Sequence, residues 1–99
     1  MVGKVLLYVS SVAGSGEIRA HQQRIRMVLE SKKINFEEVD IASVDGSKET
    51  MRDLAKDPQA LPPRIAYEDE KGNKEYVGDF EAFEEAVEDG TLQKFLKVA

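Results

Sequence analysis

Apolar and polar positions recur with two different periods along this chain, one typical of strands and one typical of helices. Residues 5–9 are apolar throughout, as expected for a central strand that is covered on both faces. Residues 17–33 place apolar side chains, among them Ile25 and Leu29, on one side at helical spacing. Residues 35–41 alternate between apolar and acidic side chains, which predicts a second, more exposed strand.

Shorter patterns predict the rest of the chain. The expected elements are, in order, a helix over 48–56, strands over 64–68 and 74–77, a helix that starts at Gly78-Asp79, and a short helix over 92–96. The turn residues Glu70–Asn73 make the two strands a hairpin. Asp79 is suited to cap the helix that follows it.

The predicted order is strand, helix, strand, helix, strand, strand, helix, helix. The first two strands and the helix between them should form a right-handed parallel unit, whereas the last two strands are antiparallel. The sequence therefore predicts an α/β protein with a four-stranded mixed sheet and helices on both faces, the plan of a thioredoxin fold. A chain of 99 residues fits one domain, residues 1–99.

Composition narrows the classes of function. The chain contains no cysteine, which excludes disulfides, thiolate metal sites and thiol redox chemistry by the chain itself. With one histidine and no cysteine, we expect no transition-metal site. The net charge is −5, and no stripe of basic residues is visible along the sequence, so we expect no nucleic-acid binding.

The hydropathy of the chain predicts a protein that stays in water. No run approaches the roughly 20 apolar residues of a membrane helix, so we expect no membrane partner. The chain enters its first strand almost at once, and we therefore expect no signal peptide. These observations favour a monomer in the cytoplasm, small enough to reach the nucleus as well.

The loop between the first strand and the first helix is where α/β proteins often place chemistry, because free N–H groups and the positive end of the helix dipole meet there. Here residues 10–16 are small and carry no obvious reactive group. A dinucleotide loop would need glycine at Arg19, and a phosphate loop would need lysine at Glu17, so a permissive tight turn is favoured. We expect His21 and Gln22 to lie largely off the apolar face of the helix, and His21 to be solvated.

A series of motifs follows in order: Glu17-Ile18-Arg19, Met51–Ala55, Leu61–Ile65, Gly78–Ala86 and Leu92–Leu96. Together they resemble the glutaredoxin branch of the thioredoxin superfamily over nearly the whole chain. Within that branch the chain is similar to the small SH3-domain-binding glutamic-acid-rich-like proteins. These proteins lack the usual cysteine pair of a glutaredoxin.

The resemblance implies a set of site residues. The Cys-Pro-Tyr-Cys motif of glutaredoxins corresponds to Gly14, Ser15, Gly16 and Glu17, which we call the vestigial redox loop. Pro63 matches the cis-proline of the fold, so the Pro62–Pro63 bond should be cis. A ligand groove would comprise Pro63, Arg64, Gly78 and Asp79, with the last two where the γ-glutamyl carboxylate of glutathione docks. Glu17 acts either as a partner of the helix dipole or as a carboxylate that blocks the site.

The resemblance also implies a function. It indicates a non-catalytic modulator or adaptor that binds protein partners, among them SH3-containing or signalling proteins, with no cofactor and at most weak glutathione binding. The alternative is a glutathione-binding sensor or a residual glutathione-linked enzyme that uses the groove. A direct SH3 ligand is not favoured, because no two of the prolines at 58, 62 and 63 are three residues apart. The acidic run Asp79–Asp89 is either a solvated helix face or a surface for a basic partner.

Overall fold

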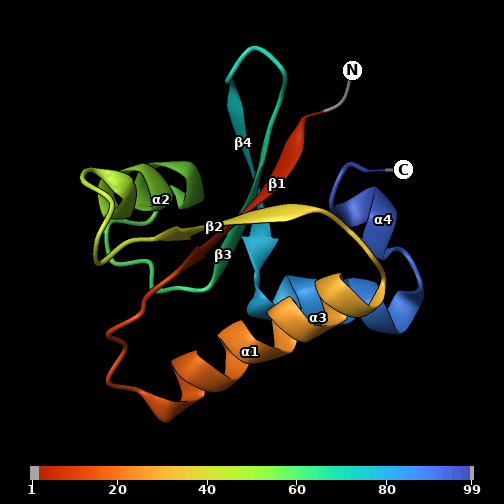
Figure 1. Ribbon diagram of the computed structural model, residues 1–99, viewed down its shortest axis with the longest axis horizontal. Coiled ribbons are helices and arrows are strands. Elements are labelled where there is room, and N and C mark those ends of the chain that lie inside the picture. The colour runs from red at the N-terminus through yellow and green to blue at the C-terminus, as the bar shows by residue number, and fades with distance from the viewer. Residues whose placement is uncertain (1–2, 99) are drawn as a thin grey trace.

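The computed structural model describes residues 3–98 and contains one four-stranded sheet with helices on both faces (Figure 1). The elements are β1 (Lys4–Val9), α1 (Gly16–Ser31), β2 (Phe36–Asp40), α2 (Ser47–Ala55), β3 (Arg64–Glu68), β4 (Lys74–Asp79), α3 (Phe80–Asp89) and α4 (Leu92–Phe95). The strand order is β2-β1-β3-β4. Strand β1 runs parallel to β2 and antiparallel to β3, and β3 runs antiparallel to β4. The predicted α/β class and mixed sheet are therefore confirmed.

Strand β1 supplies the centre of two separate cores because its side chains alternate between the faces of the sheet. Val5, Leu7 and Val9 pack with residues of α1, α3 and α4 on one face. Leu6 and Tyr8 pack on the other face, against Met51 and other residues around α2. Figure 1 shows the same division, with α2 on one side of the sheet and α1 and α3 on the other. This burial on both faces explains the uninterrupted apolar run in the sequence.

The helices begin and end slightly away from the predicted residues, and the caps explain the differences. Helix α1 starts at Gly16 because Ser15 caps it, and a left-handed Lys33 with φ of 58° follows its last turn. Residues Gly78 and Asp79 belong to β4 rather than to the next helix, which begins at Phe80. Asp79 is the N-cap of α3, as predicted. Across residues 3–98, none of the helices is both long enough and apolar enough to cross a membrane.

Candidate functional site

The vestigial redox loop lies at the start of α1. The Oγ of Ser15 accepts a hydrogen bond from the backbone N–H of Ile18 at 3.3 Å. Gly16 and Glu17 form the first turn, where the exposed Glu17 carboxylate is close to the positive end of the helix dipole. A Cβ atom added at Gly14 would meet nothing within 4 Å, and Gly14 has no left-handed φ. The loop is thus an open turn that leads into α1, and it buries no reactive group.

The predicted cis-proline is confirmed, and the residues around it form a braced loop. The Pro62–Pro63 peptide bond is cis, and both prolines are buried. Arg64 donates from Nε to the carbonyl oxygen of Leu61 at 2.8 Å and from Nη1 to the hydroxyl of Tyr76 at 3.0 Å. The guanidinium therefore ties the cis-proline loop to β4.

Gly78 and Asp79 have structural roles that the sequence did not reveal in full. Gly78 is buried, and a Cβ atom there would lie 2.9 Å from Cζ of Phe95 and 3.1 Å from Cβ of Ala82. Its lack of a side chain lets α4 pack closely onto β4. The Oδ1 of Asp79 accepts a hydrogen bond from the N–H of Ala82 at 3.0 Å, so this carboxylate is engaged as the cap of α3.

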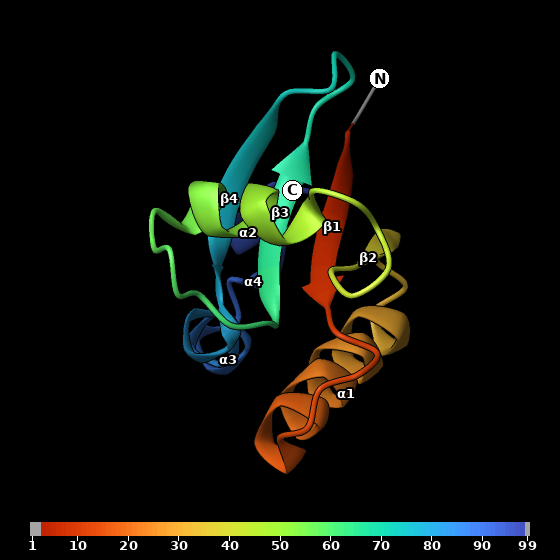
Figure 2. The same ribbon diagram turned by 90° about the vertical axis from the view of Figure 1, so that its left-hand side faces the viewer.

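The structure brings together some of the predicted site residues. The register of β3 and β4 pairs Arg64 with Asp79, next to Pro63 and Gly78. Figure 2 shows that the first turn of α1 extends beyond the end of the sheet. Within residues 3–98, no hydrogen bond or ion pair joins residues 14–17 to this group. The roles of the loop and of the groove therefore stay predictions.

Gln22 is the helix residue that contacts the end of β1, and the sequence reading missed it. Its Oε1 accepts from the N–H of Ser10 at 2.8 Å, and its Nε2 donates to the carbonyl oxygen of Ser10 at 3.3 Å. Gln22 is buried on the same side of α1 as Ile25 and Leu29. The spacing of three and seven residues from these apolar positions was the signal that could have identified it.

His21 is not a solvated side chain but part of a contact between α1 and α3. Its ring stacks on Phe80 with centroids 3.7 Å apart and planes 3° from parallel, and its Nε2 lies 3.9 Å from a carboxylate oxygen of Glu17. One turn later, Arg24 donates from Nε and Nη2 to Glu84 at 2.8 and 3.1 Å. Those hydrogen bonds lower the pKa of the Glu84 carboxyl. The two contacts hold α1 and α3 together.

Asp40, at the end of β2, anchors the other side of the loop. Its Oδ1 accepts from the backbone N–H of Ser11 at 3.1 Å and from that of Ala42 at 3.0 Å, and Oδ2 accepts from the hydroxyl of Ser43 at 3.2 Å. A hydrogen bond from the Ser11 side chain, together with those from the backbone N–H groups of Ala42 and Ser11 and from Ser43, lowers the pKa of Asp40 to about 2. The loop therefore leaves the sheet between two polar anchors, Gln22 and Asp40.

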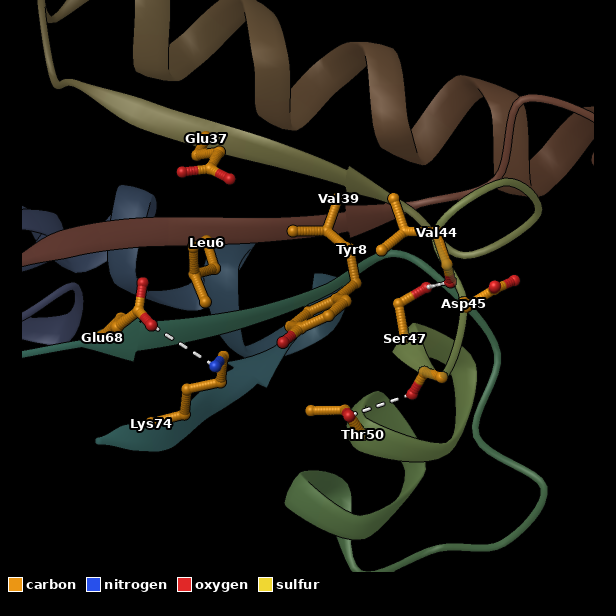
Figure 3. Close-up of a pocket in the computed structure, with 11 residues that line it drawn as sticks. Leu6, Tyr8, Glu37, Val39, Val44, Asp45, Ser47, Thr50, Glu68 and Lys74 are labelled. Atoms are coloured by element: carbon orange, nitrogen blue, oxygen red, sulfur yellow. Dashed lines mark hydrogen bonds and ion pairs between the residues drawn. The ribbon is translucent and has the colours of Figure 1, made fainter. Parts of the chain in front are cut away.

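A cavity of about 320 Å³ lies on the face that α2 covers (Figure 3). Tyr8 is buried, yet its hydroxyl points into this cavity, and in the described part of the chain no group hydrogen-bonds to it. Burial raises the pKa of Tyr8, with Glu68 and Glu37 adding to the effect. Lys74 pairs with Glu68 at 3.3 Å, and Lys4 pairs with both glutamates. The carboxylates of Glu37 and Glu68 are thus paired with lysines, whereas Asp45 in the same lining forms no ion pair among residues 3–98.

The chemistry open to these residues is hydrogen bonding and ion pairing. The chain has no thiol, so it cannot supply the nucleophile of disulfide exchange. Over residues 3–98, no group of three or more His, Cys, Asp and Glu side chains is arranged to hold a metal ion.

Comparison with known proteins places this arrangement in a family. Residues 1–99 match the sequence profile described as SH3-binding, glutamic acid-rich protein. The chain belongs to this family. A curated member, the SH3 domain-binding glutamic acid-rich protein homolog of Drosophila melanogaster, is 39% identical over 111 aligned positions that include the whole chain. The chain spans 66% of the length of that relative.

Solved structures of the same fold include two kinds of protein. The wild-type actin interacting protein 5 (Aip5) superposes with a TM-score of 0.77 at 21% identity, covering 100% of this chain and 95% of its own. Buckwheat glutaredoxin, solved as a complex with glutathione, superposes with a TM-score of 0.65 at 12% identity, covering 96% and 77%. At these identities the likeness shows the fold alone, which is glutaredoxin-like.

Proposed function

We propose that this family member is a non-catalytic protein-interaction module, a modulator or adaptor without redox activity. The observation that carries the proposal is the absence of cysteine from all 99 residues of a glutaredoxin-like domain. Disulfide exchange needs a thiolate as nucleophile and as leaving group, and no other side chain replaces it in both roles. Gly14 and Glu17, which match the two cysteines, offer neither. We expect the protein to act as a monomer in the cytoplasm, small enough to enter the nucleus as well.

A turnover assay tests the lack of catalysis. The full chain is incubated with a glutathione mixed disulfide and the usual reducing system, with a dithiol glutaredoxin as the positive control. We expect the rate with this chain to equal the rate without protein. Turnover above that background would contradict the proposal, because it would require a reaction centre that the cysteine-free chain is not expected to have.

The names of the relatives suggest two partner classes. The Drosophila relative is named for SH3-domain binding, and the solved Aip5 structures are named for actin. For an SH3 partner, the burial of Pro62 and Pro63 argues against an extended polyproline ligand. We therefore propose that such contacts use the folded surface of the domain.

Competition separates these two modes of SH3 binding. An SH3 domain that binds the full chain is titrated with an excess of its own proline-rich peptide. We expect the complex to persist, since the folded surface does not occupy the polyproline groove. Displacement by the peptide would assign the contact to the Pro62–Pro63 segment after all. Cosedimentation with actin filaments tests the second partner class in parallel.

The alternative function is a glutathione sensor that uses the groove of Pro63, Arg64, Gly78 and Asp79. Several contacts weigh against it. Asp79 is engaged as a helix cap, Arg64 is engaged with Leu61 and Tyr76, and Glu17 adds negative charge at the helix end that a carboxylate ligand would need. Glutathione binding should therefore be weak or absent, and no cofactor is proposed.

A further inference from the structure

The end of the sheet farthest from the vestigial redox loop holds a pocket whose charged side chains are all lysines. The pocket has a volume of about 420 Å³ and lies between the start of β1, the turn from α1 to β2, and the C-terminal part of the chain. Lys4, Lys32, Lys33 and Lys97 line it, and no aspartate or glutamate does. In a chain with a net charge of −5, such a concentration of positive charge is unexpected. We call it the lysine pocket.

Half of this charge is free of ion pairs. Lys4 pairs with Glu37 at 2.6 Å and with Glu68 at 3.6 Å, and Lys97 pairs with Glu75 at 3.4 Å. Within residues 3–98, Lys32 and Lys33 form no ion pair, and both are exposed. Two unpaired ammonium groups on one rim leave the pocket with an excess of positive charge.

Neutral groups complete the lining. The hydroxyl oxygen of Tyr67 accepts a hydrogen bond from the N–H of Gly3 at 2.9 Å, which leaves its own proton available to donate outward. Asn35 and Gln93 add amide groups, and Val98 supplies apolar surface. Donors and acceptors at spaced positions over an apolar floor suit an extended peptide.

The surroundings favour carboxylates over phosphate. No arginine lines the pocket, and the helix end beside it is the C-terminal end of α1, which lacks the free N–H groups of a phosphate site. Phosphate sites usually combine an arginine fork or a helix N-terminus with converging N–H groups. Dispersed lysines on separate elements match single negative charges that are spaced along a chain.

We propose that the lysine pocket binds an acidic peptide segment of a partner protein. The inference rests on the proposed function in that it takes the partner to be a protein, and it adds the chemistry of that partner. The sequence showed no basic stripe because only Lys32 and Lys33 are neighbours along the chain, and the fold brings Lys4 and Lys97 to them. Nucleic acid is disfavoured by the net charge of the whole molecule.

A peptide titration tests the proposal. The isotope-labelled full chain is titrated with a short peptide that alternates glutamate and glycine, and with the same peptide carrying glutamine in place of glutamate. We expect amide shifts at Lys33, Asn35, Gln93 and Lys97 with the glutamate peptide alone, and their loss at high salt. Equal shifts with the glutamine peptide, or none with either, would overturn the proposal. Larger shifts at these amides with inorganic phosphate or a single-stranded oligonucleotide would also overturn it.

The backbone offers variants that remove charge without endangering the fold. Lys33 and Lys97 have φ of 58° and 63°, a region in which glycine is at ease. Lys33→Gly and Lys97→Gly should keep the fold and weaken peptide binding by up to about fivefold each. Lys56→Gly is the matched control, since Lys56 has φ of 56° and caps α2 outside the pocket. Weakening by the control as large as that by either pocket variant would contradict a local site.

The peptide titration and the turnover assay test separate claims. If the peptide does not bind, the lysine pocket loses its assignment, while a background rate in the mixed-disulfide assay still supports a non-catalytic module. If turnover is observed, the proposed function fails, while shifts confined to the lysine pocket still identify a peptide site.

Discussion

At the scale of single residues, the side chains that hold the candidate site are polar and partly hidden from sequence patterns. Gln22 is buried among apolar neighbours because it replaces the missing hydrogen-bond partners of Ser10, where β1 has ended and no strand continues. A prediction from the pattern of apolar residues assigns such a glutamine to the exposed face of the helix. Its two hydrogen bonds are visible only when the helix and the strand end are placed side by side.

Replacing Gln22 by methionine should therefore destabilise the protein by about 1–3 kcal/mol. The side-chain volume is kept, but the N–H and carbonyl groups of Ser10 lose their partners in a partly buried place. The neighbouring Gln23 is exposed, so Gln23→Met should change the free energy of unfolding by no more than about 0.5 kcal/mol. Urea denaturation of both variants measures the difference, and equal losses would show that Gln22 is not an anchor.

Close packing against Phe95 requires a glycine at position 78, independently of any ligand. Gly78→Ala should destabilise the protein by about 1–3 kcal/mol, since the added methyl group would lie 2.9 Å from the ring of Phe95. Gly14→Ala is the control, because the space around Gly14 is open, and it should stay within about 0.5 kcal/mol of the parent. Thermal unfolding measures both. A Gly78→Ala variant as stable as the parent would show that packing does not require this glycine, and a binding role would then explain it.

At the scale of elements, the helices and strands were predictable because their apolar residues recur with a strand or a helix period. Residues 5–9 of β1 are all apolar, and Asp79 caps α3 as its sequence context indicates. The predicted strand over 74–77 ends two residues short of β4, because Gly78 and Asp79 still pair with β3 before the helix begins. The anchoring of the loop by Asp40 was also hidden, since it joins the ends of two elements that are far apart in sequence.

The Asp40 anchor should make stability depend on acidity. Its pKa is about 2 in the folded chain, below the ordinary value of 3.8, so its contribution is present above pH 3.8 and is lost as the pH falls through 2. Asp40→Asn should remove that part of the pH dependence of the free energy of unfolding. Asp53→Asn, which changes the charge equally on the exposed side of α2, is the control. Identical acid profiles for the parent and Asp40→Asn would contradict the anchor.

At the scale of the whole molecule, the fold and the family followed from motifs, whereas the surfaces did not. The order of elements and the Leu61–Ile65 motif were enough to predict the sheet and the cis-proline. The lysine pocket could not be foreseen, because Lys4, Lys33 and Lys97 come from separate parts of the chain and meet only in the fold. The sequence alone cannot establish the roles of Gly14–Glu17 and of the groove residues either, because these roles depend on how far α1 extends past the sheet.

The central claim is that this glutaredoxin-like domain binds proteins and does not use glutathione. A titration of the isotope-labelled chain with reduced glutathione, followed through its backbone amides, tests the claim most directly. We predict no saturable shifts at Gly14–Glu17, Arg64 or Gly78–Asp79, because Glu17 repels the carboxylates of the ligand and Arg64 and Asp79 are already hydrogen-bonded within the chain. Saturable shifts clustered at these residues, with sub-millimolar affinity, would contradict it and would identify the groove as a working glutathione site.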